Sequence, residues 1–286
     1  FNSVSKTCFT PCILCGRDAP QPVVVQRGYP IVRCGGCGLV YVHPKPPEED
    51  LPGLYAAYHG RDGGNEQGWN HLMGKVFREA ADHLDASRDG SGPPRLLDVG
   101  CGYGGFVSLM RDRGWDAEGV DPSPRTVAAA SAKGIPVRLG TLDELSRSVA
   151  AYRAITMFYV LEHLFDPMSA LRKVFGLLEP GGVLLVRVPD TTPIVRLLSP
   201  FGLGNGLYDP PFHLFDFPPL VLARMLAEAG FGKIRTFPGR NTIPPRTVPR
   251  LATMMFGALA QGLFAGTGGR FLLPGVSKTT IARKPS

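Results

Sequence analysis

The fold is decided by residues 96–106, which read Leu96-Leu97-Asp98-Val99-Gly100-Cys101-Gly102-Tyr103-Gly104-Gly105-Phe106. The apolar residues that open this stretch predict a short buried strand, and the glycines that follow predict an abrupt turn. Glycine suits such a turn because it adopts unusual backbone angles and lets a ligand approach the main chain closely. Apolar residues at helical spacing come next, so the positive end of a helix would point at that ligand.

Two acidic residues indicate which ligand the turn receives. Gly100, Gly102 and Gly105 fit the G-x-G-x-x-G pattern of dinucleotide-binding turns, and Asp121 lies about twenty residues further on. However, Asp98 at the strand end would repel a pyrophosphate and attract an ammonium group. S-adenosylmethionine carries an ammonium and a sulfonium but no phosphate, so it suits Asp98, while Asp121 would accept hydrogen bonds from the ribose. The alternative is a glycine-rich turn without a ligand.

The composition is that of a globular protein. The 286 residues are 44% hydrophobic and 19% charged, which allows one large domain and a small one. No basic-then-apolar signal segment opens the sequence, so we expect a cytoplasmic protein. The net charge of +7 is diffuse and includes no run of five basic residues, which weighs against a nucleic-acid partner.

Four of the six cysteines form two C-x-x-C pairs that predict a zinc ribbon. They are Cys12, Cys15, Cys34 and Cys37. Strand-like residues separate the pairs, and four thiolates around a tetrahedral zinc leave no open position, so the metal would be structural. His43 as a ligand and a pair of disulfides are the alternatives. Cys101 in the glycine turn is explained by the need for a small side chain.

The remaining chain divides by composition. We predict a zinc ribbon at 1–47, a linker with N-terminal helices at 48–94, and an S-adenosylmethionine-binding domain at 95–286 that includes a lid loop at 189–217 and an apolar insertion at 239–276. Residues 251–269 contain no charged side chain and nearly reach the length of a membrane span. Because several glycines interrupt them, we expect a buried or dimer-contact helix. The alternative is an apolar substrate pocket or a membrane-surface contact.

Strands and helices alternate after residue 95, which predicts an α/β fold with a parallel sheet. The expected strands are 95–99, 117–120, 136–139, 154–160, 183–188, 233–237 and 279–283. The expected helices are 70–86, 103–113, 123–133, 141–149, 167–178 and 218–229, with glycines at 181 and 182 ending the fifth helix.

Five sequence blocks in this order resemble the class I S-adenosylmethionine-dependent methyltransferases. The blocks are residues 97–102, 119–123, 160–167, 178–182 and 227–231. The resemblance covers residues 70–285 and implies a Rossmann-like seven-stranded sheet. It also implies the cofactor-binding residues, which are Asp98, Gly100, Gly102, Tyr103, Asp121, Leu142 and Phe158. For the aromatic residues, which include Tyr159, plain core packing is the alternative.

The predicted zinc ribbon also has a counterpart in known families. A zinc ribbon joined to such a domain is similar to methyltransferases that act on small molecules in bacterial secondary metabolism, among them the deoxysugar C-methyltransferases. We therefore expect a small-molecule acceptor and a monomer or homodimer.

Two histidines are the candidate catalytic residues. A base is needed if the methyl acceptor is a hydroxyl, and histidine is suited to that role near pH 7. His163 follows the fourth strand at the carboxyl edge of the sheet, and His213 lies in the loop after the fifth strand. Glu162, His163 and Asp166 are an alternative set of ligands for a divalent metal, as in the quinone-type O-methyltransferases that this motif resembles.

The leading hypothesis is O-methylation of a small molecule in a biosynthetic pathway. C- or N-methylation of a sugar or another metabolite is the nearest alternative. A further alternative is methylation of RNA or protein, with the zinc ribbon as a docking module. The last alternative is a binding module that has kept the fold but has no catalytic activity.

Overall fold

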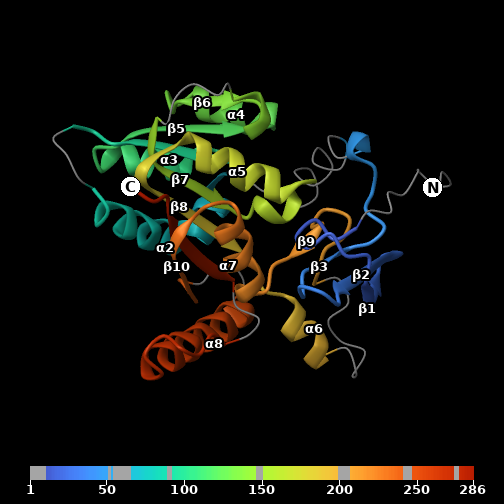
Figure 1. Cartoon of the computed structure of the whole chain (residues 1–286). Coiled ribbons are helices and arrows are strands. Elements are labelled where there is room, and N and C mark those ends of the chain that lie inside the picture. Colours follow the sequence, from blue (N-terminus) through green and yellow to red (C-terminus); the bar gives the residue numbers. More distant parts are fainter. Residues whose placement is uncertain are drawn as a thin grey trace.

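The computed structural model describes residues 11–50, 53, 66–88, 92–145, 151–198, 207–240, 247–273 and 277–286. Within them, a large α/β unit lies beside a small β unit (Figure 1). None of the helices in these ranges is long and apolar enough to cross a membrane.

The large unit is built on a seven-stranded sheet in the order β10-β11-β8-β7-β4-β5-β6. Its strands are β4 (Arg95–Val99), β5 (Asp116–Asp121), β6 (Val137–Leu139), β7 (Tyr152–Phe158), β8 (Leu178–Val188), β10 (Gly232–Phe237) and β11 (Lys278–Arg283). Strands β4 to β8 pair in parallel, but β11 is antiparallel to both β8 and β10. The expectation of an all-parallel sheet was therefore wrong at one strand. A parallel return would need a helix packed across the sheet, and the described residues between β10 and β11 form no such helix.

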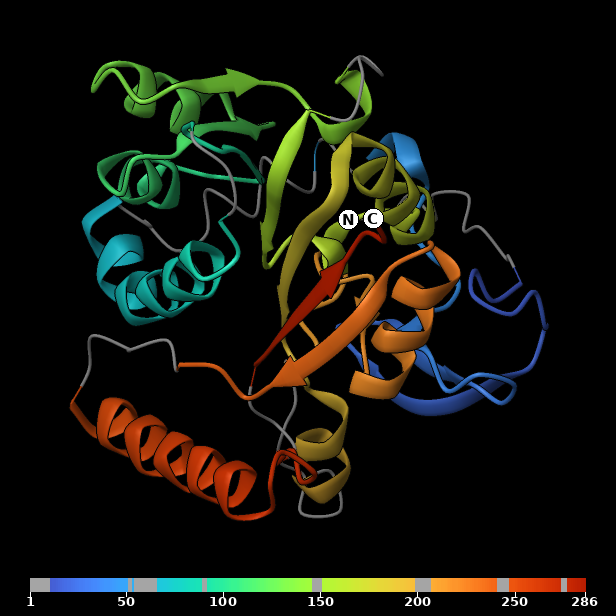
Figure 2. The ribbon, with the colours of Figure 1, turned by 60° about the vertical axis from the view of Figure 1, so that its left-hand side comes forward.

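Helices cover both faces of this sheet (Figure 2). On one face lie α2 (Glu66–Asp85), α3 (Gly105–Asp112) and α4 (Pro124–Ser131), and on the other lie α5 (Pro167–Leu177) and α7 (Pro219–Glu228). Each face has its own hydrophobic core: Met73, Phe77 and Phe106 belong to the first, and Leu171 and Leu222 to the second. Strands β4 and β7 are buried on both faces and are mainly apolar, with Asp98, Arg153 and Thr156 as buried polar residues.

The small unit is a four-stranded antiparallel sheet in the order β1-β2-β3-β9. Strands β1 (Pro20–Gln26), β2 (Tyr29–Cys34) and β3 (Val40–Val42) come from the predicted ribbon. Strand β9 (Phe215–Asp216) comes from the predicted lid loop and places Phe215 opposite Tyr41. Part of that loop is therefore regular structure, with α6 (Thr192–Leu198) near its start; residues 199–206 lie outside the described ranges.

Asp216 fixes this segment to the beginning of α6. Its carboxylate accepts hydrogen bonds from the backbone NH groups of Thr191 (2.8 Å) and Thr192 (2.9 Å). The Tyr208 hydroxyl donates to the Thr192 hydroxyl at 2.9 Å. These groups are buried, so the ordering of residues 207–216 depends on polar contacts as well as on strand pairing.

Several predicted boundaries shift. The helix expected at 141–149 is a short 3₁₀ helix, η2 (Leu142–Glu144), and residues 146–150 lie outside the described ranges. Helix α5 ends at Leu177 and β8 begins at once, so the glycines expected to form a turn lie within the strand. Helix α2 begins four residues before the expected start. Two further short helices are η1 (Glu48–Asp50) and η3 (Leu161–His163).

Candidate active site

The glycine turn between β4 and α3 adopts backbone angles that favour glycine. Gly100, Gly102 and Gly104 have φ angles of +68°, +54° and +72°. A Cβ atom at Gly100 would lie 2.4 Å from a methyl group of Val160, whereas one at Gly102 would meet no atom within 4 Å. Gly100 therefore serves the packing of the turn, and the space beside Gly102 is open to a ligand.

Asp121, at the end of β5, ties this turn to the beginning of α4. Its carboxylate accepts hydrogen bonds from the Gly102 NH (2.8 Å), the Ser123 NH (3.0 Å) and the Thr126 hydroxyl (2.8 Å). A carboxylate offers about four lone-pair positions, so three protein bonds leave room for one more donor. Asp121 thus holds the glycine turn in addition to the role that the sequence predicts for it.

Asp98 lies on the neighbouring strand and is buried. The Thr156 hydroxyl on β7 donates to its carboxylate at 2.6 Å, because the sheet register places the two residues side by side. Burial raises the pKa of Asp98 to about 7. The hydrogen bond from Thr156 lowers this pKa in part, and the negative charge of the nearby Asp121 raises it further. The carboxyl therefore titrates near neutral pH, and a bound cation would favour its charged form.

Cys101 is packed against Gly119 of β5. A Cβ atom on Gly119 would lie 2.5 Å from the Cys101 sulfur. The sequence interpretation of Cys101 as a small side chain in a crowded turn agrees with this contact. Burial raises the pKa of the Cys101 thiol.

The two aromatic residues at the end of β7 differ in their surroundings. The Phe158 ring lies 5.1 Å from the ring of Phe77 and 4.8 Å from that of Phe106, in the core beneath α2 and α3. Tyr159 is half-buried, has a φ angle of +57°, and accepts a hydrogen bond from Arg187 Nε at 2.9 Å. Core packing therefore explains Phe158, whereas Tyr159 is positioned at the sheet edge.

The other predicted cofactor residues lie around the same edge. Tyr103 is half-buried between two glycines of the turn, and Leu142 is buried in η2 after β6. A cavity of about 390 Å³ opens between α2 and α3. Its lining includes Asn70 and Gly105, and Asn70 Oδ1 is buried without a hydrogen-bond partner among the described residues.

The two candidate histidines meet although they are 50 residues apart in the sequence. Their ring centroids are 4.7 Å apart in an edge-to-face arrangement. His163 Nδ1 lies 2.9 Å from the carbonyl oxygen of Phe212. Because a carbonyl oxygen only accepts hydrogen bonds, Nδ1 carries the proton of the neutral ring and Nε2 is the basic nitrogen.

Glu162 completes this cluster. Ligand atoms of Glu162, His163 and His213 lie within 4.8 Å of one another. The Glu162 carboxyl is fully buried and reaches no hydrogen-bond partner on another described residue. Burial raises the pKa of Glu162 to about 8 and lowers that of His213 to about 4, so both are uncharged near pH 7.

Asp166 is not part of the cluster. Its carboxylate accepts a hydrogen bond from the Ser169 NH at 2.9 Å and caps the beginning of α5. The set Glu162, His163 and Asp166 was therefore wrong in its third member, and His213 takes that place.

The small β unit contacts this cluster directly. The Val42 NH donates to the Leu214 carbonyl at 2.9 Å, and the Leu214 NH donates to the Glu162 carbonyl at 2.8 Å. Lys45 is buried, with its ammonium 3.0 Å from the Phe165 carbonyl and over the Phe165 ring. A chain of main-chain hydrogen bonds thus runs from β3 through the residue after His213 to Glu162.

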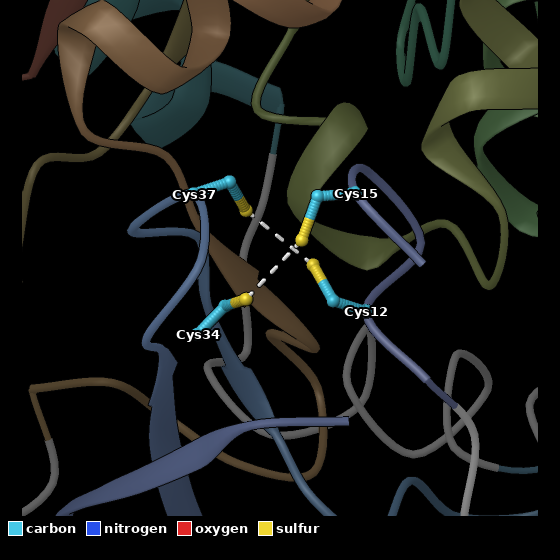
Figure 3. A group of neighbouring side chains, drawn as sticks. All are labelled: Cys12, Cys15, Cys34 and Cys37. Atoms are coloured by element: carbon cyan, nitrogen blue, oxygen red, sulfur yellow. Dashed lines mark hydrogen bonds between the residues drawn. The ribbon is translucent and has the colours of Figure 1, made fainter. Parts of the chain in front are cut away.

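The four ribbon cysteines converge within the small unit (Figure 3). The sulfurs of Cys12 and Cys37 are 3.5 Å apart, as are those of Cys15 and Cys34. All four are free thiols, so the disulfide alternative is not what the structure has. A tetrahedral zinc with Zn–S bonds of about 2.3 Å would set its sulfurs roughly 3.8 Å apart, which these positions fit. His43 lies outside this group, edge-on to Tyr41.

The surroundings of Cys34 favour its thiolate, whereas burial raises the pKa of Cys12 and Cys37. Burial opposes ionisation of Cys34, but hydrogen bonds from the backbone NH groups of Cys37 and Gly36, and from neighbouring thiols, lower its pKa to about 7. The Gly36 NH lies 3.3 Å from the Cys34 sulfur. Such NH···S contacts stabilise a thiolate, which is the form that binds zinc.

Comparison with known proteins decides the family. Residues 72–236 match the family described as "Methyltransferase domain", which is more than half of the chain. The chain belongs to the class I S-adenosylmethionine-dependent methyltransferases. A Mycolicibacterium smegmatis protein named as an S-adenosylmethionine-dependent methyltransferase is 30% identical over 190 residues, covering 66% of this chain and 65% of that protein. The ubiquinone biosynthesis O-methyltransferase of Xanthomonas axonopodis is 31% identical over 147 residues, covering 48% of this chain and 62% of that enzyme.

This methyltransferase therefore spans just under two thirds of the length of those curated relatives. Solved structures support the fold. A Haloferax volcanii methyltransferase complex with the Trm112 activator has a TM-score of 0.57 at 16% identity, covering 82% of this chain and 98% of the matched chain. Haemonchus contortus phosphoethanolamine N-methyltransferase 2, solved with S-adenosyl-L-methionine, has a TM-score of 0.54 at 13% identity, covering 80% and 60%.

Sequence reasoning missed several polar residues of this methyltransferase's site. Thr156 and Thr126 hold the two acidic residues, and Asn70 faces the turn from α2. Thr126 carries a local signal, because it follows the Ser123 cap by three residues. Thr156 and Asn70 carry none, because their contacts depend on strand register and on where α2 packs.

Replacing Gly100 by Ala should destabilise the glycine turn. The new methyl would strike Val160, and the positive φ adds strain, so we expect a loss of about 2–4 kcal/mol in the free energy of unfolding. The double variant Gly100→Ala/Val160→Ala should recover the steric part and leave roughly 1–2 kcal/mol of backbone strain. Urea unfolding measures both; equal losses in the two variants would contradict the predicted contact.

Proposed function

We propose that this methyltransferase transfers a methyl group to a hydroxyl oxygen of a small-molecule acceptor, with His163 as the general base. The hydrogen bond between His163 Nδ1 and the Phe212 carbonyl supports this role most directly, because it leaves Nε2 as the proton acceptor. The names of the ubiquinone biosynthesis O-methyltransferase relatives point to the same reaction type.

The cofactor would lie across the ends of β4 and β5. In this proposal Asp98 binds the ammonium, Asp121 accepts one ribose hydroxyl, and Gly102 lets the ligand approach the main chain. Tyr103, Leu142 and Tyr159 would line it, and Phe158 would support it from the core. S-adenosylmethionine would supply a methyl group whose bond to the sulfonium sulfur breaks as the bond to the acceptor oxygen forms, so that the cofactor leaves as a neutral thioether. The residues of the chain hold it in line with the acceptor and exclude water.

Proton removal is the chemical task that remains for the protein. As the acceptor oxygen attacks the methyl carbon, its proton would pass to His163 Nε2 while the Phe212 carbonyl stabilises the resulting imidazolium through Nδ1. His213 packs against the His163 ring and is neutral near pH 7, so it adds no competing positive charge.

The same cluster supports a second mechanism. Glu162, His163 and His213 bring one carboxyl and two imidazoles together, and the Glu162 carboxyl has no other partner on the described residues. This donor set fits a divalent cation. Such an ion would lower the pKa of the acceptor hydroxyl, and the three residues would then serve as ligands.

The other acceptor classes are less well supported. The ribbon's third strand pairs with β9 and reaches Glu162 through Leu214, so the ribbon forms part of the site. This favours a small acceptor enclosed by the ribbon over RNA or protein docked on it. C- or N-methylation remains the alternative within the small-molecule class.

We also propose that the four cysteines bind one structural zinc.

Cofactor affinity should depend on the ionisation of Asp98. The pKa of about 7 means that the free protein must release a proton from Asp98 before an ammonium binds. The affinity for S-adenosylmethionine should therefore fall about tenfold between roughly pH 7 and pH 5.5. Isothermal titration calorimetry in two buffers would measure both affinity and proton release. Asp98→Asn should bind weakly at every pH; a wild-type affinity independent of pH would contradict the role of Asp98.

Substituting His163 by Gln should slow transfer to neutral hydroxyls. Without the base, kcat should fall about 10²–10³-fold for catechol and simple phenols, while the dissociation constant of S-adenosylmethionine changes little. For a nitrocatechol, which is already ionised at neutral pH, kcat should fall much less. Labelled-methyl transfer to a panel of such acceptors measures the difference. Equal losses for both acceptor types would reject the base. Loss of activity of the unmodified protein on chelation, restored by an added divalent cation, would favour the metal mechanism.

Cys34→Ser should release zinc from the protein as purified. Metal analysis is expected to find about one zinc per wild-type chain and far less in the variant, because a structural site needs all four ligands. Amide exchange of Leu214 should also accelerate, since β9 pairs with the ribbon. Cys101→Ala, which removes a thiol outside the cluster, is the control and should retain the metal.

A further inference from the structure

Helix α8 (Thr247–Gly266) stands apart from the rest of the fold. It connects β10 to β11 and lies at the periphery, covering neither face of the seven-stranded sheet (Figures 1 and 2). Among the described residues, the other two helices longer than ten residues, α2 and α5, pack on the sheet. The sequence predicts a buried or dimer-contact helix here; burial within this chain was wrong, and a dimer contact stays a prediction.

Two small residues of the helix are buried against the fold, whereas four of its large apolar side chains are exposed. Ala260 is fully buried, Gly257 is buried, and the Gln261 side chain donates to the Gly239 carbonyl at 3.2 Å. The exposed large side chains are Met255 (74% exposed), Leu259 (53%), Met254 (43%) and Phe256 (38%), with Phe271 (45%) just beyond the helix. We call these five residues the outer face of α8. An amphipathic helix that folds onto its own domain has the opposite orientation.

The sequence contains no run of five basic residues, but the expectation that its net charge is diffuse was wrong, because the excess of positive charge falls in the part of the sequence that contains α8. Nine of the 31 Lys and Arg residues follow Glu228, whereas none of the 24 Asp and Glu residues does. The first 228 residues thus carry a net charge of −2, and the remainder carries +9. Arg235, Arg240 and Arg270 are exposed around α8, and Arg240 contacts Gln261 of the helix.

We propose that the outer face of α8 lies in the surface of an anionic lipid bilayer. Apolar side chains flanked by exposed arginines are the pattern of a helix that inserts shallowly, parallel to the membrane plane, and each nearby basic residue strengthens its attraction to anionic lipids. The helix would not cross the bilayer, because no described helix is long and apolar enough.

Two other occupants fit less well. A second copy of the chain placed symmetrically on this face would bring two strongly positive regions together without an acidic partner for either. An apolar acceptor held beneath the helix is disfavoured by the space there. A cavity of about 200 Å³ separates α8 from β10, and its lining includes Glu79, Arg235 and Arg240. A lipid chain in that cavity would take these three charged side chains out of water, although Phe237 and Phe264 also line it.

Vesicle flotation of the full-length, metal-loaded chain tests the proposal. We expect binding to vesicles of phosphatidylcholine with about one third phosphatidylglycerol, weak binding to phosphatidylcholine alone, and loss of binding at high salt. Met255→Ser/Leu259→Ser should weaken partitioning at least about tenfold, because two exposed apolar anchors are removed. Leu220→Ser is the matched control: Leu220 is 86% exposed on α7, and its loss should change binding less than about twofold.

A charge variant provides an independent measurement that does not alter the outer face. Arg270→Glu should weaken binding to the anionic vesicles about fivefold or more and leave thermal unfolding unchanged. Three results would overturn the proposal: no flotation of the wild type, equal binding to neutral and anionic vesicles, or a concentration-dependent dimer in sedimentation that the double serine variant abolishes.

Discussion

The carboxylate of Asp121 is the contact on which the arrangement of the site depends. It joins three parts of the chain that the fold must bring together: the end of β5, the glycine turn after β4, and the first turn of α4. A neutral side chain could not accept all three bonds at once. The same residue therefore fixes the conformation of the glycine turn and places a negative charge beside it. The local fold and the binding of a ligand at this turn thus depend on one side chain.

Burial then sets the electrostatic character of the site. Asp98, Glu162 and His213 are each withdrawn from water, and each shifts toward its uncharged form. Two structural units contribute to that exclusion of solvent, because β9 belongs to the ribbon's sheet while its neighbours in sequence contact Glu162 and His163. The small unit therefore contacts the segment that carries His213 and, through Leu214, Glu162.

The features that could be predicted from the sequence are those with local signals. Strand β4, its glycine turn and the spacing of the four cysteines are encoded within short stretches, and the structure has them where expected. The contacts that were missed join distant segments. Nothing in two residues of β9 predicts pairing with β3, and only the folded chain brings His213 to His163 and replaces Asp166 in that cluster. The antiparallel β11 was missed because a strand's direction is set by the path of the connection before it.

The position of β11 has a consequence for how the chain folds. Strand β11 lies between β8 and β10, although β10 precedes it by about forty residues, so β10 has no partner in the sheet until the later strand arrives. During synthesis, the main-chain groups of β10, and those at the edge of β8, stay unpaired until β11 has been made. Until β11 has been synthesised, the sheet has an unpaired edge. A nascent chain that stalls within the α8 segment is therefore the form that most needs a chaperone.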